Sequence, residues 1–403
     1  MRRLLLLCLA AGFALAASPS VETGSTPATG AAVAPALRVS VTNDLDSARP
    51  GETVELSLAA LKGRFRAEDL PRVSVAETGA PRAILVQAVD SDGDSLFDQL
   101  VFQSDFAPHE TKVFALALGS PRTARKEDYR VYGRFVRERF DDFAWENDRI
   151  AHRMYGPALE TWEKEPLTSS GVDVWAKRTR ALVVNDWYMT DDYHHDNGTG
   201  GDFYSVGKTR GCGGTGLWRD GRLWVSRNFR ETRVFANGPL RLVFELTYLP
   251  WEAGGAKVSE KKRVTLDAGS NFDRFESRYT VEGESAGDGE IVWAAGIRKV
   301  PGAAVRIGRN QGILRTWEAF KGEDGHVGCA VVLDPSSPLV EVTEADGNVL
   351  VVAQTRAGSP AVHYAGFGWD KSGDFPDVGT WDRAVDSLAR RLRSPLKISV
   401  LTK

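Results

Sequence analysis

The sequence contains few of the residues that mark several common classes of protein. Its 403 residues include three cysteines, and Cys8 lies in the first apolar run. The other two, Cys212 and Cys329, are too few for a disulfide framework, so the fold must depend on hydrophobic burial. We expect them either as one disulfide or as buried free thiols. The formal net charge is −3 and no long basic run occurs, so the sequence does not predict a basic surface that binds nucleic acid.

Long apolar segments are absent after the first sixteen residues. A membrane helix needs about 20 consecutive apolar residues, so we expect no insertion into a membrane. The N-terminus MRRLLLLCLAAGFALA combines two arginines, a short apolar run and a small-x-small ending. This pattern predicts a cleaved signal peptide over residues 1–16 and a periplasmic or secreted protein. Residues 17–36 are rich in Ser, Thr, Pro, Gly and Ala, and predict a flexible linker.

Two parts rich in strand signals follow the linker. Residues 37–119 contain short alternating runs, such as LRVSVTND and TKVFALALG, and predict a small β-sandwich domain. Residues 120–403 are expected to form the main domain, in which FDRFESRYTVEG suits an antiparallel sheet with one wet face. One helix is expected near the end, where apolar residues recur at helical spacing from Trp381 to Leu392 before Pro395. The predicted fold class is therefore mainly β.

An acidic loop lies inside the small β-sandwich. The segment DSDGDSLFD places Asp90, Asp92, Asp94 and Asp98 at spacings found in calcium loops. It lacks the closing glutamate and the flanking helices of an EF-hand. A hairpin turn rich in Asp and Gly is the favoured interpretation, with calcium binding as the alternative.

The first candidate site is YHHDNGTGGDFYSVGKTRGCGG, residues 193–214. Residues 211–216 match G-x-G-x-x-G, but a hairpin pattern follows where pyrophosphate binding requires the start of a helix. The segment GDFYSVGKT resembles a phosphate loop with one residue too many between its glycines. We interpret both nucleotide-like matches as chance.

A metal site is one chemistry that fits this stretch. His194 and His195 are adjacent, so on an extended strand they would point to opposite faces and could not share one ion. An irregular glycine-rich loop removes that restriction. Asp196 could then complete a site for a divalent ion, calcium or zinc, with help from Asp191 or Asp192.

Proton transfer on a sugar is the other chemistry. Tyr193, His194 and His195 are side chains that can exchange protons near neutral pH or after a modest pKa shift. Arg210 and Lys208 lie in the same stretch and could hold a substrate carboxylate. We predict Tyr193, His194, His195 and Arg210 as catalytic residues.

Two further stretches combine aromatic and charged residues. RFVRERFDDFAWENDRIAHRMYGPAL, residues 134–159, interleaves arginines and carboxylates with aromatic rings, as a sugar platform requires. A buried salt-bridge network is the alternative interpretation. HYAGFGWDKSGDF, residues 363–375, places charges in a glycine-rich loop after a strand. From these stretches and Lys208 we predict the substrate-binding residues: Trp145, Glu146, Asp148, Arg149, Lys208, Trp369 and Lys371.

Together, these three stretches and ANGPLRLVFELTY resemble an exported bacterial family labelled domain of unknown function 4861. The resemblance extends from about residue 37 to residue 397. It implies a large two-sheet sandwich similar to galactose-mutarotase-like proteins. It also implies a place in polysaccharide-utilisation clusters, beside lyases and unsaturated-uronyl hydrolases for pectin-like or ulvan-like polymers. It transfers no catalytic residues to this sequence.

We therefore expect a carbohydrate-active enzyme whose partner is an oligosaccharide containing uronate. In a lyase-type elimination, Arg210 or Arg149 would neutralise the substrate carboxylate, His194 or His195 would remove a proton, and Tyr193 would protonate the leaving oxygen. In hydrolysis, Glu146 and Asp148 would be the nearest carboxylate pair. A non-catalytic carbohydrate-binding protein and a sugar mutarotase or isomerase are the alternatives.

Overall fold

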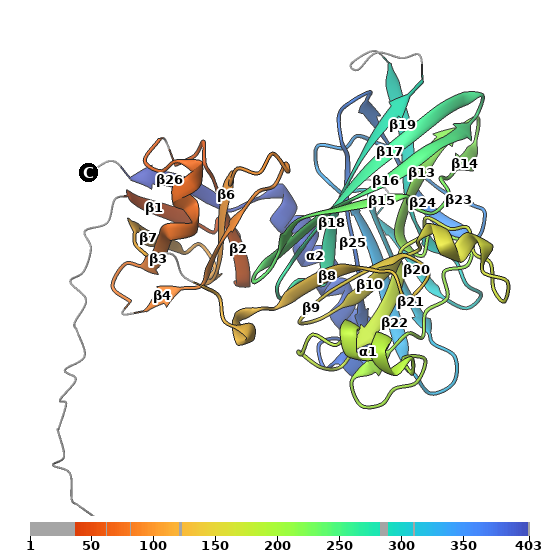
Figure 1. Ribbon diagram of the computed structural model, residues 1–403, viewed down its shortest axis with the longest axis horizontal. Helices are drawn as coiled ribbons and strands as arrows, with labels where there is room; N and C mark the ends of the chain where they lie inside the picture. The colour runs from red at the N-terminus through yellow and green to blue at the C-terminus, as the bar shows by residue number, and fades with distance from the viewer. Residues whose placement is uncertain are drawn as a thin grey trace, which may run out of the picture. The chain divides into compact units, whose positions relative to one another are not determined.

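The computed structural model describes residues 37–401 except for 62, 81, 121–122, 283–288 and 309–310. The predicted signal peptide and linker lie outside the described residues. No helix in the described part of the chain is both long and apolar enough to cross a bilayer. The described strands form five sheets and confirm the predicted β class (Figure 1).

Two of the sheets form a small sandwich, with strand orders β26-β1-β7-β3-β4 and β2-β6-β5. Alternate residues of its strands are buried, as a sheet with one wet face requires, and Val39 and Phe114 belong to its core. We assigned only residues 37–119 to this unit. The structure adds β26, which pairs antiparallel with β1 along its whole length (Figure 1). The elements are β1 (Leu37–Thr42), β2 (Arg49–Ser57), the 3₁₀ helix η1 (Ala67–Arg72), β3 (Val73–Glu77), β4 (Ala83–Ile84), β5 (Val86–Val89), β6 (Gln99–Phe106), β7 (Thr111–Leu118) and β26 (Lys397–Leu401).

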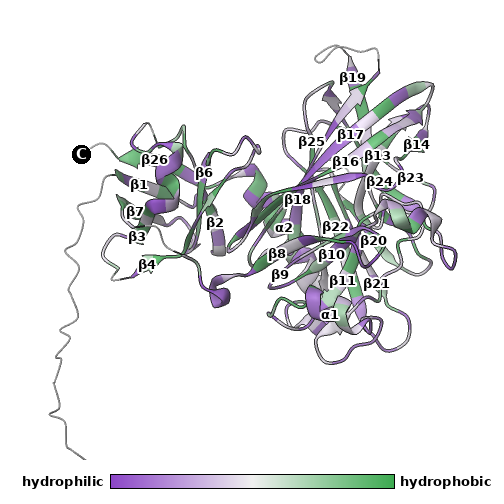
Figure 2. Ribbon diagram, viewed as in Figure 1, coloured by the Kyte–Doolittle hydropathy of each residue, from purple (hydrophilic) through white to green (hydrophobic). Residues whose placement is uncertain are grey.

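An eight-stranded sheet with order β15-β16-β17-β18-β25-β22-β21-β20 is the centre of the main part. In β18, Phe275 and Tyr279 are buried, whereas Glu276 and Arg278 lie on the opposite face, which confirms the predicted alternation. Figure 2 shows hydrophilic and hydrophobic residues mixed along β16 and β17. The strands are β15 (Glu231–Asn237), β16 (Arg241–Ala253), β17 (Ala256–Asp267), β18 (Phe272–Val281), β20 (Ala304–Gly308), β21 (Ile313–Ala319), β22 (His326–Leu333) and β25 (Ala361–Trp369).

Two five-stranded sheets cover the inner face of this large sheet, with orders β14-β13-β19-β24-β23 and β12-β11-β10-β9-β8. Trp293 of β19 packs on His363 of β25, and Phe143 of β9 stacks on Phe244 of β16 at 4.2 Å. Cys212 and Cys329 are buried free thiols in this core. The strands are β8 (Val131–Val136), β9 (Asp142–Asn147), β10 (Ala151–Met154), β11 (Asp173–Lys177), β12 (Gly200–Gly201), β13 (Cys212–Arg219), β14 (Arg222–Trp224), β19 (Glu290–Arg298), β23 (Leu339–Ala345) and β24 (Asn348–Arg356).

The predicted C-terminal helix is present as α2 (Val378–Arg393) on the outer face of the large sheet. Asp377 caps its start by accepting a hydrogen bond from the Thr380 amide, and Trp381 stacks on Phe272 of β18. A second helix, α1 (Val184–Thr190), was not predicted, because seven residues are too short to show helical periodicity. Short 3₁₀ helices occur at η2 (Lys126–Asp128), η3 (Pro157–Thr161) and η4 (Asp370–Ser372).

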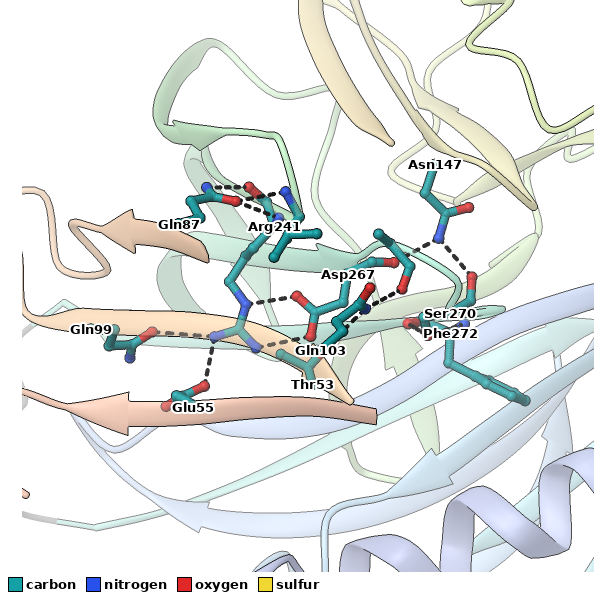
Figure 3. A network of polar contacts seen from close by, with 12 residues as sticks. Thr53, Glu55, Gln87, Gln99, Gln103, Asn147, Arg241, Asp267, Ser270 and Phe272 are labelled. Carbon is teal, nitrogen blue, oxygen red and sulfur yellow. Dashed lines mark hydrogen bonds and ion pairs between the residues drawn. The ribbon is translucent and has the colours of Figure 1, made fainter. Parts of the chain in front are cut away.

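A buried polar network joins the small sandwich to β16 and β17 (Figure 3). The Arg241 guanidinium binds both carboxylate oxygens of Asp267, at 2.6 and 2.9 Å, and donates to Glu55 and Gln99. Gln87 accepts from the Arg241 amide and donates to its carbonyl. Burial by itself lowers the pKa of Arg241, but Asp267 and Glu55 more than offset this and hold it above its usual range. Bidentate ion pairs of this kind have a defined geometry, so the contact is rigid.

Candidate functional site

One face of the sheet formed by β8 to β12 carries a row of ionisable side chains. Arg153 of β10 lies opposite Asp173 of β11 and opposite Ala144 of β9. Asp142 precedes Ala144 by two residues and therefore shares its face. The other face joins the main core through residues such as Trp145 and Val174, and it also carries the buried His152, whose Nε2 lies 3.2 Å from Asp273. The ionisable face is instead covered by α1 and the loop that follows it, through an aromatic group that includes Trp175.

The ionisable residues at one end of this face form a compact group, which we call the Arg153 cluster. The Arg153 guanidinium lies 2.9 Å from Asp173, 3.1 Å from Asp202 and 3.7 Å from Asp142. The rings of Tyr155 and Trp175 lie within 5.3 Å of it. The three carboxylates are at most 4 % exposed, and the Arg153 side chain is 12 % exposed. Three carboxylates therefore share one buried guanidinium.

This excess of carboxylates changes their affinity for protons. Burial raises the pKa of Asp142 to about 7, although Arg153 and the Gly156 amide oppose the change. Burial, with the neighbouring charge of Asp173, holds the pKa of Asp202 well above its usual range. Burial alone would lower the pKa of Arg153, but Asp173 and Asp202 hold it above its usual value. Carboxyl groups that keep a proton near neutral pH are frequent in sites that transfer protons.

Arg139 is a second arginine beside the Arg153 cluster, and it lies in a strained turn between β8 and β9. Phe140 and Asp141 have φ angles of 54° and 63°, in the left-handed region that a bulky side chain rarely adopts. Gly156 makes this turn possible, because a Cβ atom there would lie 1.8 Å from the Asp141 carbonyl oxygen. The turn holds the Arg139 guanidinium over the rings of Phe140 and Tyr193. The Arg139 side chain is 24 % exposed, so it forms an accessible edge of the cluster.

Tyr193 and His194 also belong to the Arg153 cluster. Tyr193 is fully buried and stacks on Trp175, and its hydroxyl has no hydrogen-bond partner among the described residues. Burial raises its pKa, whereas Arg153 and Arg139 lower it. The His194 side chain is 56 % exposed, and its Nδ1 lies 3.4 Å from the Asp202 carbonyl oxygen and 3.8 Å from its carboxylate. The Asp202 carbonyl can accept from Nδ1–H, which leaves Nε2 as the free ring nitrogen.

His195 has different surroundings from His194. Its side chain is 82 % exposed and contacts Asp192, which is 66 % exposed, at 3.0 Å. Both partners lie in solvent, so this contact fixes the ring weakly. The structure therefore separates the two histidines that the sequence could not distinguish, and places only His194 at the Arg153 cluster.

Arg210, predicted to hold a substrate carboxylate, lies elsewhere. It is 1 % exposed, and its guanidinium donates to the Ser170 hydroxyl and the Thr215 carbonyl. Burial lowers its pKa to about 10. Its guanidinium is enclosed by the protein core, and these contacts are those of a structural arginine. Lys208 is exposed on the same connection and does not join the cluster.

The predicted sugar platform is largely interior. Trp145 is fully buried and donates to Asp273, so its ring cannot stack on a sugar. Glu146 forms a buried ion pair of 2.6 Å with Lys177, which agrees with the alternative interpretation of this stretch as a salt-bridge network. Asp148 accepts from the Gly269 amide, and Arg149 lies 3.0 Å from Asp374.

The third predicted stretch also has a structural role. Trp369 is buried and donates to the Asp324 carbonyl, with Arg178 over its ring. The exposed Lys371 donates to the Glu323 carbonyl. Neither side chain reaches the Arg153 cluster through the described contacts.

The two segments considered for metal binding, at Asp196 and at the acidic loop from Asp90 to Asp98, have different surroundings in the structure. Asp196 binds Arg178 at 2.6 Å and accepts from two glycine amides, so its oxygens organise the loop. Within the described ranges, the one group of three side chains close enough to share an ion is Asp90, Asp92 and Asp94. Asp90 accepts from the amides of Gly93 and Ser95, as the favoured hairpin interpretation requires.

Sequence reasoning missed Asp173 and Asp202. Asp173 starts β11, whose apolar centre Val-Trp-Ala ends in Lys177, and two charges that flank a fully buried strand are the signal that could have indicated it. Asp202 follows two glycines in the first candidate stretch, where the histidines drew more attention. Arg139, Asp142 and Arg153 were recognised only as part of a charged run.

Comparison with known sequences identifies the family. The profile of the family described as Domain of unknown function (DUF4861) matches residues 41–398. The chain belongs to this family. A relative of this DUF4861 chain is "Uncharacterized protein P7" of Formosa agariphila, which is 30% identical over 375 residues. The match covers 90% of this chain and 93% of that protein.

The DUF4861 chain also resembles two solved structures from Enterococcus faecalis. One is a protein in the glycosyl hydrolase family 38, with a TM-score of 0.48 and 12% identity over 92% of this chain. The other is an alpha-mannosidase, with a TM-score of 0.47 and 10% identity over 91% of this chain. The chain spans about half the length of these structures, 48% and 46%.

Proposed function

We propose that this DUF4861 protein is an exported carbohydrate-active enzyme that cleaves uronate-containing oligosaccharides by elimination at the Arg153 cluster. The observation that carries the proposal is the convergence of two arginines, a tyrosine and a histidine beside Asp202 at one place. These are the group types that elimination beside a carboxylate needs. The saccharide class comes from the family resemblance, and its pectin-like or ulvan-like identity is part of the proposal.

Each group has a defined role in this reaction. Arg139 pairs with the substrate carboxylate and makes the proton on the adjacent carbon more acidic. The free ring nitrogen of His194 removes that proton, while Asp202 holds the ring. The electron pair left behind forms a carbon–carbon double bond as the glycosidic carbon–oxygen bond breaks. The departing oxygen takes a proton from the Tyr193 hydroxyl, and Arg153 stabilises the resulting negative charge. All steps use side chains of this chain.

Hydrolysis is the second candidate, and the pKa of Asp142 supports it. A carboxyl group with a pKa of about 7 can donate a proton to a leaving group at neutral pH. However, Asp142 is 1 % exposed and accepts a hydrogen bond from the Gly156 amide. Tyr193 is as buried as Asp142, but elimination also uses His194 and Arg139, which are 56 % and 24 % exposed, so elimination is favoured.

The paired variants His194→Ala and His195→Ala test the proposal. Pectin-derived and ulvan-derived oligosaccharides are incubated with each protein, and unsaturated products are followed by their ultraviolet absorbance. We expect His194→Ala to lose about 10²–10⁴-fold in kcat/KM, the usual contribution of a general base. His195→Ala should stay within about twofold of the wild type, because its ring is solvated and has no part in the cluster.

The outcome also separates the alternative functions. Saturated products from an active wild type would replace elimination by hydrolysis. Binding with no product over long incubation would make the protein a carbohydrate-binding module, and a changed anomer or epimer without cleavage would make it a mutarotase or isomerase. Equal activity in both histidine variants would remove His194 from the mechanism.

A further inference from the structure

A large cleft lies on the outer face of the eight-stranded sheet, away from the Arg153 cluster. It has a volume of about 1030 Å³ and is lined by β16, β17, β18 and β25, by α2, and by β2 of the small sandwich. Its floor consists of the wet-face side chains of these strands. Arg274 of β18 lies directly opposite Tyr364 of β25, and Glu276 follows on the same face at the next alternate position.

The walls of the cleft are held in place by ion pairs. Arg241 ties β16 to the small sandwich through Glu55 (Figure 3). Arg391 of α2 binds Glu52 of β2 at 2.8 Å and closes the other side. Both contacts are partly buried, and walls held in place reduce the cost of ordering the protein when a ligand binds.

The charges around the cleft balance. It is lined by five arginines and five carboxylates: Arg149, Arg241, Arg263, Arg274 and Arg391, and Glu52, Glu55, Asp267, Glu276 and Asp334. Each arginine lies within 3.3 Å of a carboxylate, which leaves further N–H groups and carboxylate lone pairs unused. The unused guanidinium N–H groups can donate to both the carboxylates and the hydroxyls of a uronate-containing chain. The unused carboxylate lone pairs can accept from its hydroxyls.

Apolar side chains complete this arrangement. Phe272, Phe375 and Leu388 of α2 line the cleft with edges that are at most 8 % exposed, and the half-buried ring of Tyr364 lines it too. Aromatic and aliphatic surface beside a few fixed polar groups is typical of ligand sites, and the volume is at the upper end of the roughly 300–1,000 Å³ usual for them. An oligosaccharide has both kinds of surface, since its ring hydrogens are apolar and its hydroxyls are polar.

The cleft and the Arg153 cluster lie at opposite ends of the β9–β10 hairpin. Arg149, in the turn of the hairpin, lines the cleft, whereas Asp142 and Arg153 lie at its open end. The strand from Asp142 to Asn147 spans roughly 17 Å at about 3.3 Å per residue. We propose that the cleft is a second saccharide-binding site, which holds a polysaccharide chain at a distance from the bond that is cleaved. This inference rests on the proposed saccharide substrate.

Arg274→Ala and Arg278→Ala form a matched pair for testing the cleft. Both arginines lie on the same face of β18, but Arg278 is outside the cleft and donates to the Gly358 carbonyl. Each change is placed in the His194→Ala background, so that the probe is not consumed. Binding of pectin-derived and ulvan-derived octasaccharides is then measured by calorimetry. We expect Arg274→Ala to weaken binding at least tenfold and Arg278→Ala to change it less than twofold.

A steric variant guards against an indirect effect of Arg274→Ala on folding. Ser387 of α2 lines the cleft, and Ser387→Trp places a bulky ring in it without removing a charge. This variant should also lose binding while keeping its thermal midpoint within a few degrees of the parent. Unchanged affinity in both Arg274→Ala and Ser387→Trp, or no binding of either octasaccharide to the parent, would overturn the proposal. If His194→Ala retained full turnover, the proposed reaction would fail. The two arginine variants would then be compared by their retardation in polysaccharide affinity gels, which does not require an intact oligosaccharide, and this comparison would decide the cleft.

Discussion

Two buried groups of ionisable side chains lie on the same face of the β8–β12 sheet, and they differ in their balance of acidic and basic residues. Glu146 and Lys177 form a pair of one acid and one base, and Glu146 also accepts from the amides of Val183 and Val184 at the start of α1. The Arg153 cluster has three carboxylates around one guanidinium. The first group is balanced and the second is not.

This difference explains why one group is structural and the other is suited to chemistry. Burial lowers the pKa of Lys177, but the Glu146 carboxylate beside it opposes this change, so the pair satisfies its own charges. In the Arg153 cluster the excess carboxylates keep protons, and the Tyr193 hydroxyl has no partner within the described chain. Unsatisfied groups with displaced pKa values are available to a substrate, whereas a satisfied pair is not.

The largest expected effect comes from breaking the balanced pair. Glu146→Gln leaves the Lys177 ammonium buried without its counter-charge, and we expect a loss of about 3–5 kcal/mol in the free energy of unfolding. Urea unfolding followed by fluorescence measures this loss. The double variant Glu146→Gln with Lys177→Met removes the stranded charge and should recover a large part of it. Equal destabilisation of the single and double variants would contradict a pair that acts through charge.

A smaller effect is expected from removing the accessible arginine of the unbalanced cluster. Arg139→Ala should lower kcat/KM by about 10–100-fold, mainly through a higher KM, because a charge-assisted hydrogen bond to a carboxylate contributes roughly 1.5–3 kcal/mol. Arg137→Ala is the control, since Arg137 is exposed in the same turn. Equal kinetics for the two variants would show that Arg139 has no substrate to bind.

The smallest effect is a dependence of the free energy of unfolding on pH, which comes from the titration of Asp142 in the Arg153 cluster. The pKa of Asp142 is about 7 in the folded protein and about 3.9 in an unfolded chain. Between these values the folded state holds a proton that the unfolded state has lost, so stability falls as pH rises. The slope is at most about 1.4 kcal/mol per pH unit.

Asp142→Asn removes this titration while keeping an oxygen that can accept from the Gly156 amide. Urea midpoints at pH 5, 6 and 7 should therefore decline less in the variant than in the wild type. Parallel curves for the two proteins would show that Asp142 is not the group that titrates in this range.

The alternation of apolar and polar residues predicted most of the strands, because a strand with one buried face needs a period of two. The same reasoning predicted α2, whose apolar residues recur at helical spacing. It did not place β26, since nothing in the local pattern of Lys397–Leu401 shows that its partner is β1 at the other end of the chain. It also missed α1, which packs its aromatic residues against Trp175 and has too few turns for a periodic pattern.

The candidate site was likewise predicted only in part from the sequence. The sequence indicated three candidate stretches, because arginines, carboxylates and histidines gather there among aromatic residues, and two of these stretches contribute to the Arg153 cluster. Asp173 of the cluster lies outside all three. Only the tertiary structure decided which members meet. Register across β9, β10 and β11 brings Arg153 to Asp142 and Asp173, and the loop after α1 adds Asp202 and His194, whereas Arg210 turns into the core. Distance along the chain does not limit such contacts once strands pair, so proximity in space follows from pairing and packing rather than from spacing in the sequence.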